Sequence, residues 1–408
     1  MKVWILNPYG NLPNENWRPH RSFMASEAFT NAGHEVTYWI SNIDHRSKQV
    51  RTVSSDLLSI NGIKLRVVES TSYNEHISVD RIKFETNFIK EFAKKAVYEG
   101  ELPDLIIIGE PSLFVSFTFV RFVEKHNIPF IIDMVDLWPE LFRIILPKPL
   151  RFLDKILFAP LYWKRSWFIK KAAGILSVSE AYLEIAKKDN KSEKFKVVYL
   201  GVDLSNFDNI DVSDFTVPQK GNGEFWVIYA GTLGNNYDTK GLIDLAKSIE
   251  NSKLDLKLFI AGDGNLKNFV LNSIKEFRLQ KTQFLGRLTP NYLVNLYQQC
   301  DIALSMYSKD STVSMPVKAF DYFAAGLPII NSLGMDLKRF IEIYNVGLNY
   351  TPENHEELFG KILTLVQNPD VLLEMKNNSI QLAKRFDKKN IYKHYVEFAE
   401  EVYSKLYC

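Results

Sequence analysis

The chain has few cysteines, and it lacks the long apolar runs of a signal peptide or a membrane-spanning helix. It contains two cysteines, Cys300 and Cys408, among 408 residues. Two cysteines cannot form a disulfide framework, and they fit a reducing compartment. The N-terminus lacks the apolar run of a signal peptide, and no stretch approaches the roughly 18–20 apolar residues of a membrane span. We therefore expect a cytoplasmic protein, either free or on the inner face of the membrane.

The net charge is close to zero, and the chain has few sequence patterns typical of metal binding. The chain has 50 basic and 48 acidic residues, a formal charge of +2. A nucleic-acid-binding protein usually carries a strong basic excess, so we expect no nucleic-acid partner. The seven histidines are scattered, and no metal-binding run such as His-x-x-x-His falls at a predicted strand end. This pattern favours a reaction that needs no metal ion.

The composition that is present is that of a folded α/β protein, with 46% apolar and 24% charged residues. Two domains are expected, because a single core stops growing near about 250–300 residues. Short apolar runs alternate with helical patterns, which predicts parallel sheets covered by helices. In the first half, the predicted strands are 3–7, 35–40, 105–109, 130–133 and 174–178.

The alternation pauses at a polar stretch, 208–224, and then restarts. In the second half, the predicted strands are 225–230, 256–261, 283–285, 302–305 and 328–331. Near the C-terminus, apolar residues recur at helical spacing. We predict an α/β protein with two Rossmann-like domains whose parallel sheets face each other across a cleft. The predicted parts are a first domain at 1–207, a linker at 208–224, a second domain at 225–386 and a helix at 387–408 that packs back on the first domain.

The most informative segment is a predicted helix start after the strand at 302–305. Pro316 suits the first helical turn, and the N–H groups of a helix start form an anion site, to which Ser314 and Met315 would contribute. Lys318 and Asp321 share one helix face, so Lys318 can meet phosphate while Asp321 accepts hydrogen bonds from sugar hydroxyls. A capped helix with a surface ion pair is the alternative.

Further loops at predicted strand ends offer glycines and cations. The loop from Gly231 to Gly241 opens a helix, its glycines let a diphosphate approach, and Lys240 can supply charge. A glycine-rich turn without a ligand is an equal alternative. The loop matches neither the dinucleotide fingerprint nor the P-loop, which argues against a nicotinamide oxidoreductase. The other predicted donor-binding residues are Gly10, Thr232, Gly262, Gly264 and Arg287.

In the first half, the strand at 130–133 leads into a run with two carboxylates and a tryptophan. A carboxylate at the carboxyl end of a strand suits an active site, so we predict Asp136 near the reacting centre. Asp136 as a helix cap is an equal alternative. A long loop after the first strand carries basic residues that can meet donor diphosphate or acceptor phosphate. The predicted acceptor-side residues are Arg18, Arg21, Trp138 and Glu140.

Residues 151–171 combine basic side chains with leucine, isoleucine, phenylalanine and tryptophan. Such a stretch can lie on an anionic membrane surface, which would make the protein a peripheral membrane protein. The favoured alternative is a helix that packs its apolar side on the sheet and leaves a basic face in water.

Taken in order, these motifs resemble glycosyltransferase family 4, a retaining family with the GT-B fold. The resemblance covers nearly the entire chain and is carried by the runs at 33–36, 177–180, 201–207, 261–264, 284–286, 316–322 and 325–328. It implies sugar transfer, without a metal or other cofactor, from a UDP- or GDP-type nucleotide-sugar to a lipid-linked or glycan acceptor. It also points to the members that build capsule, O-antigen or other cell-surface polysaccharide. Under this interpretation Asp136, Lys240 and Lys318 are the predicted catalytic residues.

One departure from the family keeps a second interpretation open. The family has two glutamates with seven residues between them; Asp321 takes the second position and Val313 the first. A valine side chain cannot hydrogen-bond a sugar, so a catalytically degenerate GT-B protein that binds or scaffolds is the alternative. A two-lobed ligand-binding protein would instead need a secretion signal.

Overall fold

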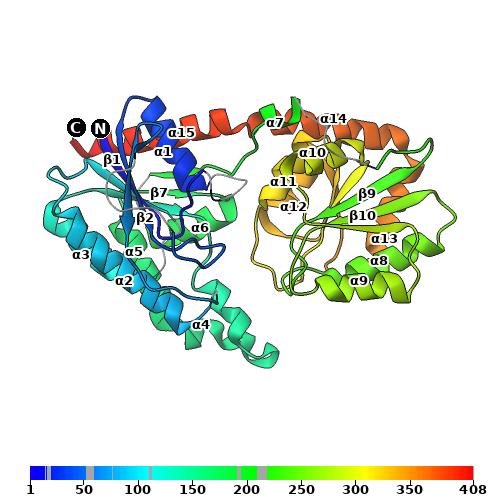
Figure 1. Cartoon of the computed structure of the whole chain (residues 1–408), viewed down its shortest axis with the longest axis horizontal. Helices are drawn as coiled ribbons and strands as arrows, with labels where there is room; N and C mark the ends of the chain where they lie inside the picture. Colours follow the sequence, from blue (N-terminus) through cyan, green and yellow to red (C-terminus); the bar gives the residue numbers. More distant parts are fainter. Residues whose placement is uncertain are drawn as a thin grey trace. The chain divides into compact units, whose positions relative to one another are not determined.

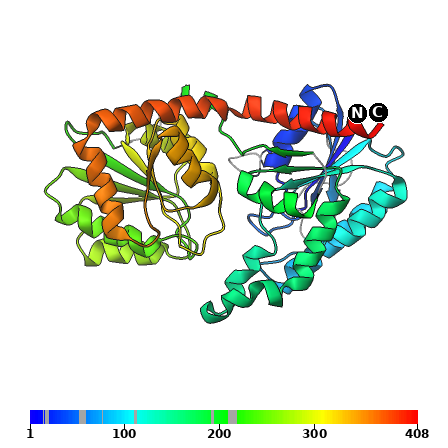
Figure 2. The same cartoon turned by 180° about the vertical axis from the view of Figure 1, so that it is seen from behind.

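The computed structural model describes residues 1–13, 15, 20–51, 59–75, 77–109, 113–190, 194–208 and 218–407. It consists of two compact units: unit 1 contains Met1–Tyr199 and Ile391–Cys408, and unit 2 contains Leu200–Asn390. Each unit is a sheet with helices on its faces (Figures 1 and 2). The division falls at Tyr199, earlier than the expected 207, and residues 209–217 of the expected linker lie outside the described residues.

Unit 1 is built on an eight-stranded sheet in the order β3-β4-β2-β1-β5-β6-β7-β8. Neighbouring strands are parallel except β3 and β4, which pair antiparallel. Nearly all positions of the central strands are buried, as expected for a parallel sheet covered on both faces. The strands are β1 (Lys2–Leu6), β2 (Glu35–Ser41), β3 (Ser59–Ile60), β4 (Ile63–Val68), β5 (Leu105–Gly109), β6 (Phe130–Met134), β7 (Gly174–Ser177) and β8 (Phe195–Val197).

The helices of unit 1 follow the strands they connect. They are α1 (Arg21–Asn31), α2 (Val79–Ala96), α3 (Ser116–His126), α4 (Asp154–Leu157), α5 (Ala159–Lys171) and α6 (Glu180–Asp189), with 3-10 helices η1 (Glu140–Ile145) and η2 (Lys148–Leu153). Ser78 caps α2 by accepting a hydrogen bond from the backbone N–H of Arg81 at 3.1 Å. The buried face of α2 carries Phe84, Phe88 and Phe92 at helical spacing, which explains why this sequence forms a core helix.

Unit 2 is built on a six-stranded parallel sheet in the order β11-β10-β9-β12-β13-β14. Its strands are β9 (Phe225–Ala230), β10 (Leu256–Ala261), β11 (Thr282–Gly286), β12 (Ile302–Ser305), β13 (Ile329–Asn331) and β14 (Gly347–Asn349). The predicted α/β architecture of two parallel sheets is therefore confirmed. The sequence did not reveal β3, β4, β8 or β14; β3 has two residues, β8 and β14 have three each, and β8 is only partly buried.

The helices of unit 2 cover both faces of its sheet, with α8, α9 and α13 on one face and α10, α11 and α12 on the other (Figure 1). They are α7 (Ser205–Asp208), α8 (Thr239–Asn251), α9 (Lys267–Glu276), α10 (Pro290–Gln299), α11 (Val317–Ala324), α12 (Met335–Tyr344), α13 (His355–Gln367) and α14 (Pro369–Arg385). The predicted start of α11 is one residue away from the observed one, because Pro316 is its N-cap.

The last helix, α15 (Lys388–Tyr407), leaves unit 2 and packs on unit 1. The Tyr395 hydroxyl donates to Asp133 Oδ2 at 3.1 Å, and Lys194 Nζ donates to the Val402 carbonyl at 3.3 Å. Gly174 makes room for this helix, since a Cβ there would lie 2.8 Å from Val402 Cγ2. The expected return of the C-terminal helix to the first domain is present.

Candidate functional site

The carboxyl edge of the unit 2 sheet is the natural place for a ligand. From β9 the chain proceeds through β10 and β11 on one side, while β12, β13 and β14 lie on the other. The strand order therefore reverses between β9 and β12. In open α/β sheets, ligands bind outside the carboxyl ends of the strands at such a reversal.

Backbone hydrogen bonds hold three of the predicted donor loops together at this edge. The Gly231 N–H donates to the Ala261 carbonyl at 2.9 Å, and the Gly262 N–H donates to the Gly286 carbonyl at 2.7 Å. Gly262 has φ +156°, and a Cβ there would lie 1.9 Å from the Gly231 carbonyl oxygen. The loops after β9, β10 and β11 thus form one continuous layer. Position 262 must be glycine, because any side chain there would collide with the backbone of the neighbouring loop.

The loop after β12 joins this layer from the other side of the reversal. The Ser308 N–H donates to the Asn236 carbonyl at 3.1 Å, and Tyr237 and Tyr307 form an isolated antiparallel bridge. Their rings lie 4.8 Å apart. The sequence predicted that both loops lie at one edge of the sheet. It could not predict that they pair directly, because the pairing depends on β9 lying beside β12.

Lys318 lies under this pairing, in the first turn of α11. Its Nζ is buried and has no hydrogen-bond partner in the described part of the chain. The Nζ is 4.8 Å from the ring centre of Tyr229, 5.0 Å from Tyr307 and 5.6 Å from Tyr237. Burial lowers the pKa of Lys318 to about 7. The site therefore holds an amine enclosed by three aromatic faces, next to Gly231, where a Cβ would lie 3.2 Å from Nζ.

The other predicted residues of this helix start are buried. Ser314 Oγ accepts from the Asp336 N–H at 3.3 Å, which links the segment to the start of α12. Met315 and Pro316 are buried beside it, and Asp321 is buried on α11 with 5% of its surface exposed. Ser314 thus has a packing role here, and ribose binding by Asp321 stays a prediction.

Three predicted donor residues are exposed near the same edge: Thr232, Arg287 and Lys240, which lies in the first turn of α8. That helix is capped by Asp238, whose carboxylate accepts from the Gly241 N–H at 2.9 Å. Gly264 has φ +152°, and a Cβ there would lie 2.2 Å from the Leu233 carbonyl oxygen, so its role includes close backbone packing. The exposed residues are placed where a charged ligand could reach them.

In unit 1, Asp136 is exposed just after β6, so its predicted catalytic role is compatible with its position. Glu140 pairs with Arg165 of α5, whose Nη1 lies 2.6 Å from Glu140 Oε2 and 3.1 Å from the Trp138 carbonyl. This ion pair fixes the segment that carries Trp138. The Arg81 guanidinium lies 4.9 Å from the Trp138 ring centre.

Two predicted residues of unit 1 have structural roles that the sequence did not show. Arg21 was expected in an acceptor-side loop, but it begins α1 and its Nε donates to Asp133 Oδ2 at 2.7 Å, with both side chains 2% exposed. Gly10 was expected to let a donor approach, but a Cβ there would lie 2.0 Å from the Tyr38 hydroxyl, so packing alone requires glycine. Arg18 lies outside the described residues.

The basic stretch at 151–171 differs from the favoured expectation of a helix with its apolar side on the sheet. In α5 only Phe168 and Ile169 are buried. Large apolar side chains are instead exposed: Phe152 by 75%, Ile156 by 72% and Trp163 by 63%. We call Leu150, Phe152, Ile156, Leu157 and Trp163 the apolar surface of unit 1.

Sequence reasoning missed two groups of side chains. Of the tyrosines around Lys318, Tyr229 lies in β9, and Tyr237 and Tyr307 lie in the loops after β9 and β12. Only the pairing of these two strands brings them together. The second group is Tyr9, Arg81 and Glu85: Arg81 Nε lies 3.0 Å from both the Tyr9 hydroxyl and Glu85 Oε1. A signal for Glu85 existed, because it lies beside Phe84 and Phe88 on the apolar face of α2.

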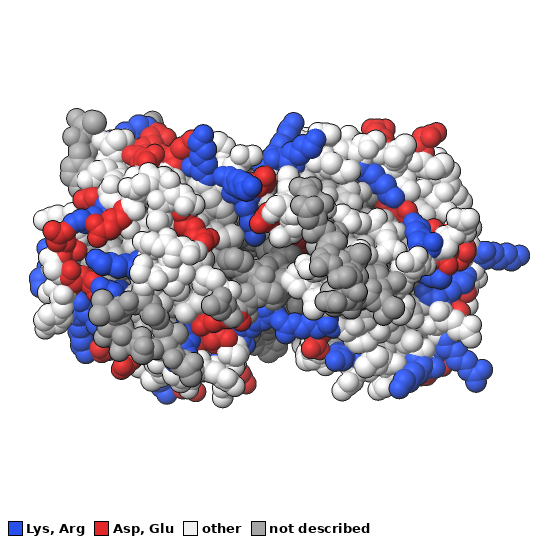
Figure 3. All heavy atoms as spheres, turned by 45° about the horizontal axis from the view of Figure 1, so that its top comes forward, with Lys and Arg blue, Asp and Glu red and all other residues white. Residues whose placement is uncertain are grey.

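Among the described residues, no three or more His, Cys, Asp or Glu side chains gather as a metal site would require. The helices of the same described ranges include none that is long and apolar enough to cross a bilayer. On the face drawn in Figure 3, basic and acidic side chains are interspersed rather than gathered in one stripe.

Residues 213–384 match the family model described as "Glycosyl transferases group 1". A related protein is chitobiosyldiphosphodolichol beta-mannosyltransferase of Kluyveromyces lactis, 28% identical over 156 residues. The match covers 36% of this chain and 34% of that protein. The chain thus spans about a third of the length of this curated relative.

Solved structures resemble the whole chain. Sucrose-phosphate synthase of Thermosynechococcus elongatus aligns with a TM-score of 0.76 and 14% identity over 99% of both chains. HepE of Anabaena in complex with UDP aligns with a TM-score of 0.68 and 13% identity, over 98% of this chain and 100% of the other. Together, the family match, the related protein and the solved structures support the assignment of this chain as a glycosyltransferase. The chain has the GT-B fold, and its second unit matches the group 1 glycosyl transferases.

Proposed function

We propose that the chain is a retaining glycosyltransferase that moves a sugar from a nucleotide-diphosphate donor to a lipid-linked or glycan acceptor in the synthesis of cell-surface polysaccharide. The observation that carries this proposal is the site at the carboxyl edge of unit 2. There the loops after β9, β10, β11 and β12 join into one layer, and tyrosines of β9 and of the loops after β9 and β12 enclose the amine of Lys318. The same loops lie within the segment that matches the glycosyl transferase model.

The chemistry of this site suits a departing diphosphate. As the bond to the sugar breaks, negative charge develops on the diphosphate, and fixed donors aimed at that charge lower the barrier. Lys318 can take up a proton near neutral pH, and the exposed Lys240 and Arg287 lie near the same edge. Asp321 would bind the ribose of a UDP- or GDP-type donor. Asp136 would orient the reacting groups from unit 1.

Donor binding is tested first by thermal shift with UDP-, GDP-, dTDP- and CMP-sugars, because a ligand that binds only the folded state raises its stability. Lys240→Ala should then lower kcat, since only interactions that strengthen in the transition state speed the chemical step. Asp321→Ala should weaken donor binding by about 1.5–3 kcal/mol. If none of these donors raises the melting temperature, the proposal is contradicted. Stabilisation without any transfer would favour the degenerate, binding-only alternative.

Two finer parts of the proposal have separate tests. Retention predicts that the product keeps the anomeric configuration of the donor, which proton NMR of the first product distinguishes from inversion. Metal independence predicts full activity after dialysis against EDTA. Loss of activity that Mg²⁺ or Mn²⁺ restores would contradict it.

We also propose that unit 1 rests on a membrane through the apolar surface of unit 1. Basic side chains lie among these apolar ones, Lys155 and Lys170 being exposed, and anionic lipids attract such residues. Co-sedimentation with phosphatidylglycerol vesicles should exceed that with phosphatidylcholine vesicles, and Phe152→Ser/Ile156→Ser should reduce both. Phe269→Ser/Ile343→Ser, at exposed positions of unit 2, is the matched control. Equal binding by both double variants would refute the assignment.

A further inference from the structure

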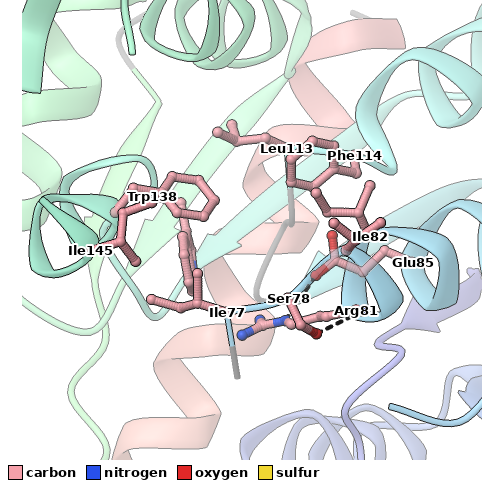
Figure 4. Close-up of a pocket in the computed structure, with 11 residues that line it drawn as sticks. Ile77, Ser78, Arg81, Ile82, Glu85, Leu113, Phe114, Trp138 and Ile145 are labelled. Carbon is pink, nitrogen blue, oxygen red and sulfur yellow. Dashed lines mark hydrogen bonds and ion pairs between the residues drawn. The ribbon is translucent and has the colours of Figure 1, made fainter. Parts of the chain in front are cut away.

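Unit 1 contains a cavity of about 260 Å³ that the donor chemistry does not use. It lies between the first turns of α2, the segment before α3, and the run from Trp138 through η1. Its walls are mainly apolar: Ile82, Leu113, Phe114, Trp138, Phe142 and Ile145. Figure 4 shows Ile82 and Glu85 on one side, Trp138 and Ile145 on the other, and Leu113 and Phe114 above.

One side of the cavity is polar and incompletely paired. Glu85 lines the cavity, is 3% exposed and pairs with Arg81 and the Tyr9 hydroxyl through Oε1 alone. Its Oε2 is buried and has no hydrogen-bond partner in the part of the chain that the structure describes. An unpaired buried carboxylate oxygen is costly. It would gain a hydrogen bond from an occupant that brings an O–H or N–H group.

The position of this polar side relates the cavity to the reaction. Tyr9 belongs to the loop after β1, and Trp138 to the loop after β6, so both lie at the carboxyl edge of the unit 1 sheet. This is the edge where the fold class binds its ligands. The polar end of an occupant at Glu85 would therefore lie at the reactive edge.

The opposite side of the cavity adjoins exposed apolar surface. Ile145 lines the cavity and is itself 54% exposed at the end of η1. The chain continues directly into η2 and α4, which carry Leu150, Phe152 and Ile156 of the apolar surface of unit 1. In Figure 1 this segment projects beyond the sheet of unit 1. A hydrocarbon chain leaving the cavity past Ile145 would thus meet apolar surface rather than water.

The cavity volume matches a hydrocarbon segment. A cavity of about 150 Å³ lined by apolar side chains holds a benzene ring, so 260 Å³ has room for on the order of ten carbon atoms. A whole sugar nucleotide would not fit, and its charges would lose their water against the apolar walls.

We infer that this cavity binds the first part of the hydrocarbon chain of a lipid-linked acceptor, with Glu85 Oε2 accepting a hydrogen bond from the acceptor head group. The inference rests on the proposed function, which identifies the occupant as an acceptor. It narrows that acceptor from a lipid-linked molecule or a glycan to a molecule with an alkyl or isoprenyl chain. Arg81 and Trp138 are positioning residues here, because the Arg81 guanidinium lies 4.8 Å from the ring centre of Tyr9 and 4.9 Å from that of Trp138.

The test measures binding by calorimetry on the full chain without donor. The probes are hexyl, octyl and decyl β-D-glucoside, each below the concentration at which it forms micelles. If the chain is buried, affinity should rise by up to about fourfold per added methylene. Decylphosphocholine has the same chain but a head group without a hydrogen-bond donor, so it should bind more weakly than decyl glucoside.

Filling the cavity should abolish the dependence on chain length. Ile82→Trp places an indole in the cavity, and Val79→Trp does so from its rim, where Val79 is 67% exposed and folding is little affected. Each should weaken decyl glucoside binding at least tenfold. Ile343→Trp, at an exposed position on α12 of unit 2, is the matched control and should bind as the parent does. Glu85→Leu should remove the preference for glucoside over phosphocholine.

Each outcome decides between the inference and its rivals. Affinity that does not change with chain length, or that survives both tryptophan variants, overturns the hydrocarbon assignment. Equal binding of decyl glucoside and decylphosphocholine assigns the cavity to a bilayer lipid and overturns the acceptor assignment. Donor thermal shifts report on unit 2 separately. Donor binding without chain-length dependence refutes only this inference. Chain-length dependence without donor binding refutes the proposed function, and with it the acceptor assignment, but leaves the hydrocarbon site in place.

Discussion

The enclosed amine of Lys318 makes an unusual prediction: replacing a residue proposed to assist catalysis should stabilise the protein. Lys318→Met keeps the length and apolar stem of the side chain but removes the ammonium group. In the folded chain that group is buried, without a hydrogen-bond partner among the described residues. Methionine fills irregular apolar sites and packs well against aromatic rings, so the three tyrosine rings should accept it.

The magnitude follows from the pKa of Lys318. Burial lowers it from 10.5 to about 7. Each tenfold change in proton affinity corresponds to about 1.4 kcal/mol, so near pH 7 the charge penalty is about 5 kcal/mol. Any attraction of the three tyrosine rings for the ammonium group is already contained in that pKa. Lys318→Met should therefore raise the free energy of unfolding of unit 2 by up to about 5 kcal/mol at pH 7.

The pH dependence separates this cause from better packing. Between pH 7 and 10.5 the unfolded chain holds the lysine proton and the folded chain does not, so raising the pH stabilises the parent protein. The advantage of Lys318→Met should thus shrink toward pH 10. Amide exchange of peptides from β9 and β12 reports the stability of unit 2 directly. Lys240→Met, at an exposed lysine of the same edge, should gain nothing. An advantage that is absent at pH 7, or equal at pH 7 and 10, would refute the reasoning.

Three further predictions concern packing and charge. Gly262→Ala should destabilise unit 2 by several kcal/mol in chemical denaturation and weaken donor binding, because its Cβ would lie 1.9 Å from the Gly231 carbonyl oxygen; wild-type stability would contradict the close approach. Burial raises the pKa of Glu85 from 4.5 to about 7, so the free energy of unfolding of unit 1 should fall by about 3 kcal/mol as the pH rises from 4.5 to 7. Glu85→Gln should remove this pH dependence, measured by amide exchange at several pH values. An unchanged pH dependence in the variant would contradict the prediction. Asp133→Asn leaves the buried Arg21 without its counterion and should destabilise unit 1 by about 3–5 kcal/mol, with faster amide exchange in α15, whereas Glu400→Gln on the surface should have little effect in the same experiment.

The sequence by itself determined the architecture of each unit. Alternating apolar runs and helical patterns are local signals, and short, near-continuous apolar runs such as those of β5 and β9 are typical of parallel strands buried on both faces. The glycines at 231, 262 and 264 and the proline at 316 are likewise local signals, since each marks a backbone geometry at one position. For the same reason the predicted donor loops fall at strand ends of unit 2.

Only the tertiary structure decided what those loops and side chains do together. The order of strands placed β9 beside β12, and this pairing encloses Lys318 with tyrosines from positions 229, 237 and 307. The pairing of Arg21 with Asp133 joins residues 112 positions apart, so no local pattern could reveal that Arg21 is structural. The cavity beside Glu85 also depends on three segments meeting in space. Local propensity fixes the elements, whereas charge state, burial and cavities depend on contacts between residues distant in sequence.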